Sequence, residues 1–286
     1  MSLSAPHPKA AVLQYTARGS QEETLPIAEA LITAAAEAGA KIICLPECAN
    51  FLAADKTSLK AKAEEEANSP SLALFTRLAK KHQIILSAGS LMMASDQEKN
   101  GDERLANRSF LIDETGKIAA RYDKIHMFDA DVGDHKSYRE SASFTAGSTP
   151  VLAMIGDVAV GLSICYDVRF PHLYRQLALG GAKLLLVPAA FTAISGKAHW
   201  HILLRARAIE TGCFIVAPAQ SGTHADGRQT YGHSLIINPW GEIIADAGDG
   251  DAVISADLDL AAVAKARQAI PSLLTNPAIE PPRFIT

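Results

Sequence analysis

Apolar runs typical of strands alternate with helical patterns in the first third of the chain. Three runs rich in Val, Ile and Leu and bounded by turn residues predict strands, at residues 9–15, 41–45 and 83–91. Between them, residues 22–38 and 71–82 repeat apolar positions at helical spacing. Gly39 follows the first of these segments, where a helix-ending glycine belongs. This part of the chain therefore predicts a β-α-β opening.

The middle of the chain predicts a hairpin, and the second half restarts the alternation. A polar stretch at residues 95–104 joins two strand-like segments, and residues 107–113 and 117–122 flank a turn at 114–116. Later patterns predict helices at 171–179, ended by Gly180 and Gly181, and at 197–211. Strands are predicted at residues 158–164, 183–188, 213–219, 231–238, 241–245 and 252–257.

The balance of strands and helices determines the expected architecture. Predicted strands outnumber helices by roughly two to one, and each apolar sheet face and helix stripe needs a partner. Two sheets stacked face to face, with helices on their outer faces, satisfy this requirement. No internal repeat, low-complexity linker or long charged run divides the sequence. We therefore expect a single-domain α/β fold, a four-layer α-β-β-α sandwich.

Composition and charge narrow the class of protein. Of 286 residues, 48% are hydrophobic and 20% are charged, which is too apolar and too weakly charged for a disordered chain. With 27 Lys and Arg against 31 Asp and Glu, the net charge is −4, so we expect no nucleic-acid partner. No stretch approaches the about 18 apolar residues that a membrane helix needs, and residues 1–10 are polar, unlike a signal peptide. We expect a cytoplasmic protein with no membrane partner.

The cysteines and histidines do not form the pattern of a disulfide framework or a zinc site. None of the four cysteines forms a CxxC pair, and the nine histidines are scattered. The closest pair, His199 and His201, is two residues apart and would point to different faces of a helix. We therefore expect reduced cysteines, no metal and no cofactor.

The most informative segment is an apolar strand that runs into a cysteine, at residues 158–171. The strand leads to Cys165, and a helix begins six residues later with Pro171 at its first position. A nucleophile on such a strand-to-helix turn lies near free backbone N–H groups that can hold an oxyanion. On this segment alone, a small buried core cysteine is the alternative interpretation.

Two other predicted strands end in ionisable side chains. Residues 41–47 form a buried strand that ends directly in Glu47, and a half-buried glutamate with a raised pKa makes a general base. Residues 121–128 end another strand with Lys124. Taken alone, each could be an exposed charge. Together with Cys165 they are the residue types that acyl transfer needs as base, oxyanion clamp and nucleophile.

The three segments resemble the catalytic signatures of the nitrilase superfamily of carbon–nitrogen hydrolases. They are Leu-Pro-Glu at 45–47, Tyr-Asp-Lys-Ile-His at 122–126 and Cys-Tyr-Asp-Val-Arg-Phe-Pro at 165–171. The likeness keeps the order and spacing of the signatures and extends over nearly the whole chain. It implies one carbon–nitrogen hydrolase domain over residues 1–286, mainly 8–265, with a C-terminal tail at 266–286.

The resemblance also implies a role for each residue. Cys165 would be the nucleophile, Glu47 the base and Lys124 the stabiliser of the tetrahedral intermediate. Glu140 would be a second acid that positions substrate or assists proton transfer. The Lys124 ammonium and the Tyr166 backbone N–H would hold the oxyanion. Because two carboxylates oppose the effect of Lys124 on the thiol, we expect resting Cys165 to keep its proton until Glu47 removes it.

The second half resembles the branch of this superfamily whose members hydrolyse deaminated glutathione or short ω-amides, and the first activity is the closer likeness. The segments that carry it are residues 189–192, 196–200, 203–211, 220–224 and 231–234. By this resemblance the enzyme would cleave the side-chain amide of the α-keto analogue of glutathione, giving 2-oxoglutarate and cysteinylglycine, as a metabolite-repair amidase.

Three residues are candidates for binding this small-molecule amide. Carboxylate substrates need cationic or hydroxyl anchors, and Arg169, four residues after Cys165, is a candidate bidentate partner. Phe191 and Thr192 follow a predicted strand and could line the same pocket. A structural ion pair for Arg169 and ordinary loop packing for Phe191 and Thr192 are the alternatives.

Other functions stay open at this stage. Omega-amidase action on α-ketoglutaramate or α-ketosuccinamate is the nearest alternative, and nitrile hydrolysis shares the same route. A papain-like enzyme would pair Cys165 with His126 or His233. A catalytically silent binding protein would keep the fold alone, but such a protein has no chemical need for Glu47, Lys124 and Cys165 together.

The resemblance carries one departure and one further expectation. Members of the branch often have a Pro-Gly pair where Gly133 and Asp134 stand, so the loop at residues 129–135 that leads to Glu140 is expected to take another path. Members also form dimers or larger assemblies, and the helix at residues 197–211 is expected to serve such a contact.

Overall fold

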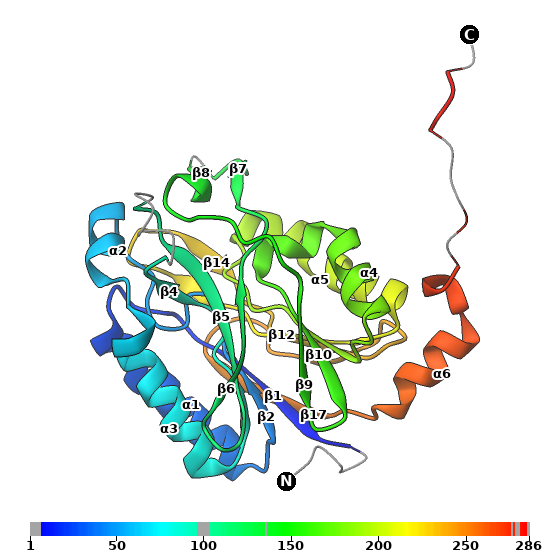
Figure 1. The fold of residues 1–286 in the computed structure, drawn as a ribbon. Coiled ribbons are helices and arrows are strands. Elements are labelled where there is room, and N and C mark those ends of the chain that lie inside the picture. Colours follow the sequence, from blue (N-terminus) through cyan, green and yellow to red (C-terminus); the bar gives the residue numbers. More distant parts are fainter. Residues whose placement is uncertain (1–6, 96–102, 135, 276, 278–280, 285–286) are drawn as a thin grey trace.

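The computed structural model of the protein describes residues 7–95, 103–134, 136–275, 277 and 281–284. Two β-sheets pack face to face, and helices cover their outer faces (Figure 1). The α-helices in these residues are α1 (Gln21–Glu37), α2 (Lys56–Lys62), α3 (Pro70–His82), α4 (Pro171–Leu179), α5 (Ala193–Thr211) and α6 (Ala261–Ala269). The expected single-domain, four-layer α-β-β-α sandwich is confirmed.

Each large sheet combines a parallel centre with antiparallel edges. The first has the order β17-β1-β2-β3-β5-β4, with β6 paired to β5, and comprises β1 (Lys9–Gln14), β2 (Ile42–Cys44), β3 (Ile85–Ser87), β4 (Leu91–Met93), β5 (Ala106–Ile112), β6 (Ile118–Asp123) and β17 (Ala252–Asp257). The second has the order β16-β15-β12-β11-β10-β9 and comprises β9 (Val151–Ile155), β10 (Val158–Leu162), β11 (Leu184–Leu186), β12 (Phe214–Ala217), β15 (Leu235–Ile237) and β16 (Ile243–Asp246). Two ribbons pair β7 (Asp129–Asp131) with β8 (Ser137–Arg139) and β13 (Ser221–Thr223) with β14 (Gln229–Tyr231).

Strand β1 shows how the sheets are buried on both faces. Ala10 and Val12 belong to the core between the two sheets, whereas Ala11 and Leu13 belong to the core beneath α1 and α3. Successive side chains of a strand point to opposite faces, so this segment supplies both cores. This double burial explains why the central strands are continuous apolar runs in the sequence.

The strand directions bring several loops to one edge of the first sheet. Strand β2 pairs parallel with β3, β3 pairs antiparallel with β5, and β5 pairs antiparallel with β6. Strands β2 and β6 therefore point the same way, and the residues that follow them, Glu47 and Lys124, come to the same edge. In the second sheet β10 and β11 are parallel, so Cys165 and Ala190 also leave at one edge.

Some predicted elements differ from the structure in their bounds. The strand expected at residues 83–91 is two strands, β3 and β4, because the chain turns at residues 88–90, where Gly89 has a φ of +65°. The strand expected at 231–238 is the end of β14 and all of β15, separated by Gly232 and His233, both with positive φ. Helix α5 begins at Ala193, four residues before the expected start.

Other elements were not predicted, and some expectations lie outside the described residues. Helix α2 has no buried residue and therefore no apolar stripe to mark it, and β9, α6 and the two ribbons were also missed. The polar stretch at 95–104, the start at 1–10 and the loop at 129–135 include residues 96–102, 1–6 and 135, which lie outside this part of the chain. None of the described helices has the length and apolar character needed to cross a bilayer.

The turn at Gly89 supports the loop that carries Glu47. A Cβ at Gly89 would lie 1.9 Å from the Pro46 carbonyl oxygen, and the residue has a positive φ. Ser90 donates a backbone hydrogen bond to that same oxygen at 3.3 Å, and its own carbonyl accepts from Ala49 at 2.8 Å. The two loops therefore touch backbone to backbone.

We predict that Gly89→Ala lowers the free energy of unfolding by more than the matched substitution Gly39→Ala. Both residues have positive φ, which costs a non-glycine residue about 1–3 kcal/mol, but a Cβ at Gly39 meets nothing within 4 Å. Gly89→Ala should also lose activity, because the clash with Pro46 displaces Glu47. Urea unfolding of both variants measures the difference, and equal midpoints would show that the Pro46 contact is unimportant.

Candidate active site

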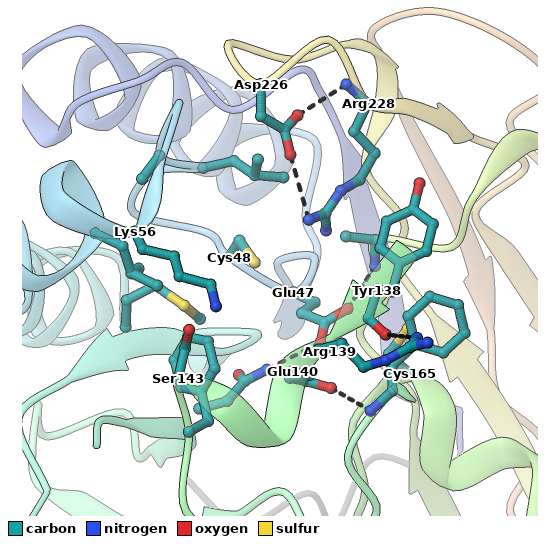
Figure 2. Close-up of a pocket in the computed structure, with 18 of the residues that line it drawn as sticks. Glu47, Cys48, Lys56, Tyr138, Arg139, Glu140, Ser143, Cys165, Asp226 and Arg228 are labelled. Carbon is teal, nitrogen blue, oxygen red and sulfur yellow. Dashed lines mark hydrogen bonds and ion pairs between the residues drawn. The ribbon is translucent and has the colours of Figure 1, made fainter. Parts of the chain in front are cut away.

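A cavity of about 270 Å³ lies at the shared edge of the strands, and it contains all three ionisable residues singled out from the sequence (Figure 2). Glu47 follows β2, Lys124 directly follows β6, and Cys165 follows β10. Glu140, at the start of a short 3₁₀ segment after β8, lines the same cavity. Residues far apart in the sequence therefore meet in one place.

The Glu47 carboxylate is buried and held by donors from three directions. Its Oε1 accepts from Lys124 Nζ at 2.9 Å and from Asn107 Nδ2 at 2.9 Å, and its Oε2 accepts from the Ala190 backbone N–H at 2.8 Å. The Gln220 side-chain amide donates to the Glu47 carbonyl oxygen at 2.9 Å. These bonds fix both the carboxylate and the loop that carries it.

The ionisation of Glu47 differs from the sequence expectation. A half-buried carboxyl with a raised pKa was predicted, but the side chain is only 4% exposed and its pKa is lowered from its ordinary value. Burial by itself would raise the pKa. The Lys124 ammonium and the hydrogen bonds to the carboxylate outweigh burial, so the charged form is the stable one.

Lys124 is a buried ammonium shared by two carboxylates. Its Nζ lies 2.9 Å from Glu47 Oε1 and 2.8 Å from Glu140 Oε2, and the side chain is 2% exposed. Burial would lower the pKa of Lys124, but Glu140 and Glu47 raise it well above its ordinary value. Lys124 therefore stays charged at every pH at which the protein is folded.

Glu140 reaches the site in spite of the departure in the preceding loop. Gly133 takes a φ of +84°, and Asp134 accepts hydrogen bonds from the Lys136 backbone at 3.2 Å and from the Tyr138 hydroxyl at 2.5 Å. Glu140 Oε2 then accepts from the Phe128 backbone N–H at 2.6 Å. The ribbon of β7 and β8 thus places this carboxylate against the lysine.

Cys165 sits at a strained position in a strand-to-helix turn. It begins a 3₁₀ segment, Cys165–Arg169, with a φ of +48°, and its backbone N–H donates to the Pro188 carbonyl at 2.8 Å. Burial and the neighbouring Glu47 carboxylate, which hydrogen bonds the thiol, raise the pKa of Cys165 well above its ordinary value, and Lys124 opposes them. The resting side chain is therefore a protonated thiol with its acceptor already in contact.

The backbone N–H of Tyr166 lies in the first turn of this same segment. N–H groups in a first turn have no acceptor within the helix, so they are available to an oxyanion beside Cys165. The Tyr166 ring packs edge to face against Phe128 and Phe170, at centroid distances of 5.1 and 5.4 Å. These contacts fix the residue.

The three residues expected to bind substrate lie at different depths. Thr192 lines the main cavity, and together with Phe191 it also lines a second, smaller hollow of about 20 Å³ beside Cys165. Arg169 lies farther out, in a neighbouring hollow, with its guanidinium over the rings of Tyr166 and Phe191 at 5.7 and 5.1 Å. Its Nη1 is 3.2 Å from His199 Nδ1. A carboxylate contact for Arg169 stays a prediction.

The sequence analysis missed several residues that shape the cavity. Asn107 bridges the two acids, donating to Glu47 and, at 3.2 Å, to Glu140. An asparagine inside the buried strand β5 was a visible signal, since a buried polar side chain needs a specific partner. Lys56, Tyr138, Arg139, Asp226 and Arg228 also line the cavity, and no local pattern marked them.

The two histidines considered as partners for Cys165 face elsewhere. His126 stacks on Phe170 at 3.6 Å, and its Nδ1 lies 2.7 Å from Asp167 Oδ1. His233 Nδ1 lies 3.0 Å from Asp246 Oδ1. Neither histidine lines the described part of the cavity, so the geometry supports a Glu-Lys-Cys arrangement over a papain-like pair.

One group in the described part of the chain has ligand atoms spaced for a metal ion. His201, His233 and Asp246 place theirs within 4.8 Å of one another. Asp246 already accepts hydrogen bonds from both imidazoles, at 3.1 and 3.0 Å, which accounts for the cluster without an ion. None of these three residues lines the cavity that contains Cys165.

Comparison with known proteins agrees with this geometry. A protein from Synechocystis sp. named deaminated glutathione amidase is 43% identical over 266 residues, covering 92% of this chain and 96% of that protein. The crystal structure of the C. elegans NitFhit protein matches 94% of this chain with a TM-score of 0.86 and 35% identity. This chain spans 65% of that longer chain.

A third similar protein has a modified active-site cysteine. It is an amidase from Nesterenkonia sp. AN1, whose structure shows the Michael addition of acrylamide at that cysteine. It matches with a TM-score of 0.77 and 25% identity, covering 94% of this chain and 100% of that one. A family model described as carbon–nitrogen hydrolase matches residues 9–268. The chain therefore belongs to the carbon–nitrogen hydrolase family.

Proposed function

We propose that this protein is an amidase that hydrolyses the side-chain amide of deaminated glutathione to 2-oxoglutarate and cysteinylglycine. The observation that carries the chemistry is the contact of Glu47 with both Lys124 and Cys165 in one cavity. The substrate is inferred from the relatives, since proteins from Synechocystis sp. and Mus musculus, at 43% and 36% identity, are both named deaminated glutathione amidase.

In the proposed first step, Cys165 attacks the amide carbon. The thiol proton passes to Glu47, which is already its hydrogen-bond acceptor, and the carbonyl electron pair moves onto oxygen. The Lys124 ammonium and the Tyr166 N–H hold this oxyanion. When the tetrahedral intermediate collapses, the C–N bond breaks, Glu47 gives its proton to the departing amine, and a thioester remains on Cys165.

The second step reverses these roles with water. Glu47 takes a proton from a water molecule that attacks the thioester, and the tetrahedral intermediate uses the same oxyanion donors. Collapse then breaks the C–S bond, Glu47 returns the proton to sulfur, and the acid is released. One carboxyl group thus serves as base and acid in both halves, with no net change in the enzyme.

The resting ionisation states suit this sequence of proton transfers. Proton transfer from Cys165 to Glu47 is uphill in the free protein, because the thiol pKa is raised and the carboxyl pKa is lowered. An oxyanion that attracts the Lys124 ammonium weakens the hold of that ammonium on Glu47, so Glu47 becomes a better base as the intermediate forms. Glu140 keeps Lys124 oriented throughout, and we assign it that positioning role.

The binding roles of Arg169, Phe191 and Thr192 are part of the proposal. Phe191 and Thr192 lie beside Cys165 and would contact the acyl group. Arg169 lies next to these residues, over the Phe191 ring, where its cation would attract a carboxylate of the acyl half.

We also propose a homodimer or larger homo-oligomer in the cytoplasm. Ile194, Ile202 and Ile209 are 51%, 69% and 53% exposed, and their spacing along α5 places them on one side of the helix, which supports an interface there. The four cysteines are free and buried, which suits a reducing compartment.

We predict that the wild-type protein has a higher kcat/KM for deaminated glutathione than for α-ketoglutaramate or α-ketosuccinamate. Cys165→Ala should lower activity on each by roughly 10⁴-fold or more, because the covalent route is lost. Release of cysteinylglycine and 2-oxoglutarate measured by mass spectrometry tests both statements. Activity of Cys165→Ala near the wild-type level would rule out the thioester, and a preference for the short amides would indicate an omega-amidase.

We predict that Glu47→Gln lowers the pKa of the Cys165 thiol. The Glu47 carboxylate raises this pKa by its charge and its hydrogen bond, so removing the charge should move the pH midpoint of alkylation to lower pH. The rate of iodoacetamide labelling of the Cys165 peptide, followed by mass spectrometry, measures the midpoint. Glu242→Gln, which removes an exposed carboxylate outside the cavity, is the control and should leave it unchanged. A midpoint that rises in Glu47→Gln contradicts the assigned contact.

A further inference from the structure

The cavity extends from Cys165 to an end that carries cationic side chains. Lys56 of α2 and Arg228, next to β14, line it from separate elements, and Figure 2 shows both side chains extending toward its centre. No residue of α2 is buried, so the cavity is open to solvent at this end. The mechanism described above uses neither Lys56 nor Arg228.

The Arg228 guanidinium is fixed but incompletely paired. Its centre lies 5.3 Å from the centroid of the Tyr138 ring, and its Nη2 is 3.3 Å from Asp226 Oδ2. Asp226 Oδ1 also accepts from the Arg228 backbone N–H at 2.8 Å, so the acid holds the whole residue. The buried Nε–H has no hydrogen-bond partner in the described structure. A buried donor without an acceptor is unfavourable, and an anionic group in the cavity would correct this.

The charges in the cavity differ between its two ends. Near Cys165, the two carboxylates of Glu47 and Glu140 outnumber the single ammonium of Lys124. At the other end Asp226 balances Arg228, and Lys56 adds a positive charge with no ion-pair partner among the described residues. A second carboxylate of a substrate is therefore repelled from the first end and attracted to the second.

The order of product release indicates which half of the substrate lies at this end. The amine product must leave before water attacks, while the acyl half stays bonded to Cys165. The leaving half therefore lies toward the open end, beside Lys56 and Arg228, and the acyl half lies toward the small hollow of Phe191 and Thr192. In deaminated glutathione the leaving half is a dipeptide that ends in a carboxylate.

We propose that Arg228, assisted by Lys56, binds the terminal carboxylate of the leaving peptide and is a specificity-determining residue of this enzyme. The inference rests on the proposed function. Arg228 offers two edges of its guanidinium, and with Asp226 on one of them the Nε edge is left for the ligand. α-Ketoglutaramate, which shares the acyl half but releases only ammonia, does not extend to Arg228.

The test compares Arg228→Gln with wild type on three substrates. These are deaminated glutathione, its analogue with a C-terminal carboxamide, and α-ketoglutaramate. Arg228→Gln should lower kcat/KM for deaminated glutathione by roughly 10- to 100-fold, as expected for a lost charge-assisted hydrogen bond. The variant should match wild type on the other two substrates, and Arg228→Lys should recover part of the loss.

A second pair of variants tests the site without changing a buried residue. Lys56→Gln should show the same substrate pattern with a smaller loss, because Lys56 is exposed. Lys60→Gln is its matched control, since Lys60 is on the same helix but pairs with Glu103 and does not line the cavity. Lys60→Gln should behave as wild type on all three substrates.

Two outcomes would overturn the inference while leaving the proposed function in place. An equal loss on deaminated glutathione and α-ketoglutaramate would show that Arg228 acts on the shared acyl half or on the catalytic groups. No loss on any substrate would show that it binds nothing. A wild-type protein that cleaves α-ketoglutaramate but not deaminated glutathione would instead overturn the proposed function, and the inference with it.

Discussion

The site depends on one buried electrostatic arrangement, a single ammonium held between two carboxylates. Lys124 lies within 3 Å of both Glu47 and Glu140, and Lys124 and Glu47 are almost fully inaccessible to water. Buried charges are stable only when each is paired and hydrogen-bonded. The chain meets this condition with an asparagine and two backbone N–H groups, from Ala190 and Phe128, which belong to different loops. Placing those donors requires both sheets and the β7–β8 ribbon.

This arrangement also governs the nucleophile. In cysteine hydrolases that use an imidazolium partner, the thiolate exists before substrate binds. Here the excess of negative charge around Lys124 keeps the thiol protonated, and the acceptor is a carboxylate in direct contact with it. A protonated buried thiol is a poor target for oxidants and alkylating agents. The chemistry is thus reserved for a ligand that brings a carbonyl oxygen to the lysine.

Local patterns revealed what depends on strand geometry and missed what depends on long-range packing. Glu47, Lys124 and Cys165 could be found because each ends an apolar strand, and parallel strands share an edge. Arg228 could not be found, since it reaches the cavity from a two-stranded ribbon with no apolar pattern. Helix α2 was missed because it buries no side chain, and the break between β3 and β4 because the positive φ of Gly89 is imposed by the loop it contacts. The lowered pKa of Glu47 likewise depends on distances that a sequence does not contain.

Asp167 gives the site a mechanical property of its own. This fully buried carboxylate accepts from the Tyr122 hydroxyl at 2.6 Å and the His126 backbone N–H at 3.1 Å, on either side of Lys124. It also accepts from the Ile164 backbone N–H at 2.9 Å, next to Cys165. The lysine loop and the cysteine turn are therefore riveted to a common point. Thermal displacements of the two should be correlated, so the separation of sulfur and ammonium fluctuates less than the position of either loop.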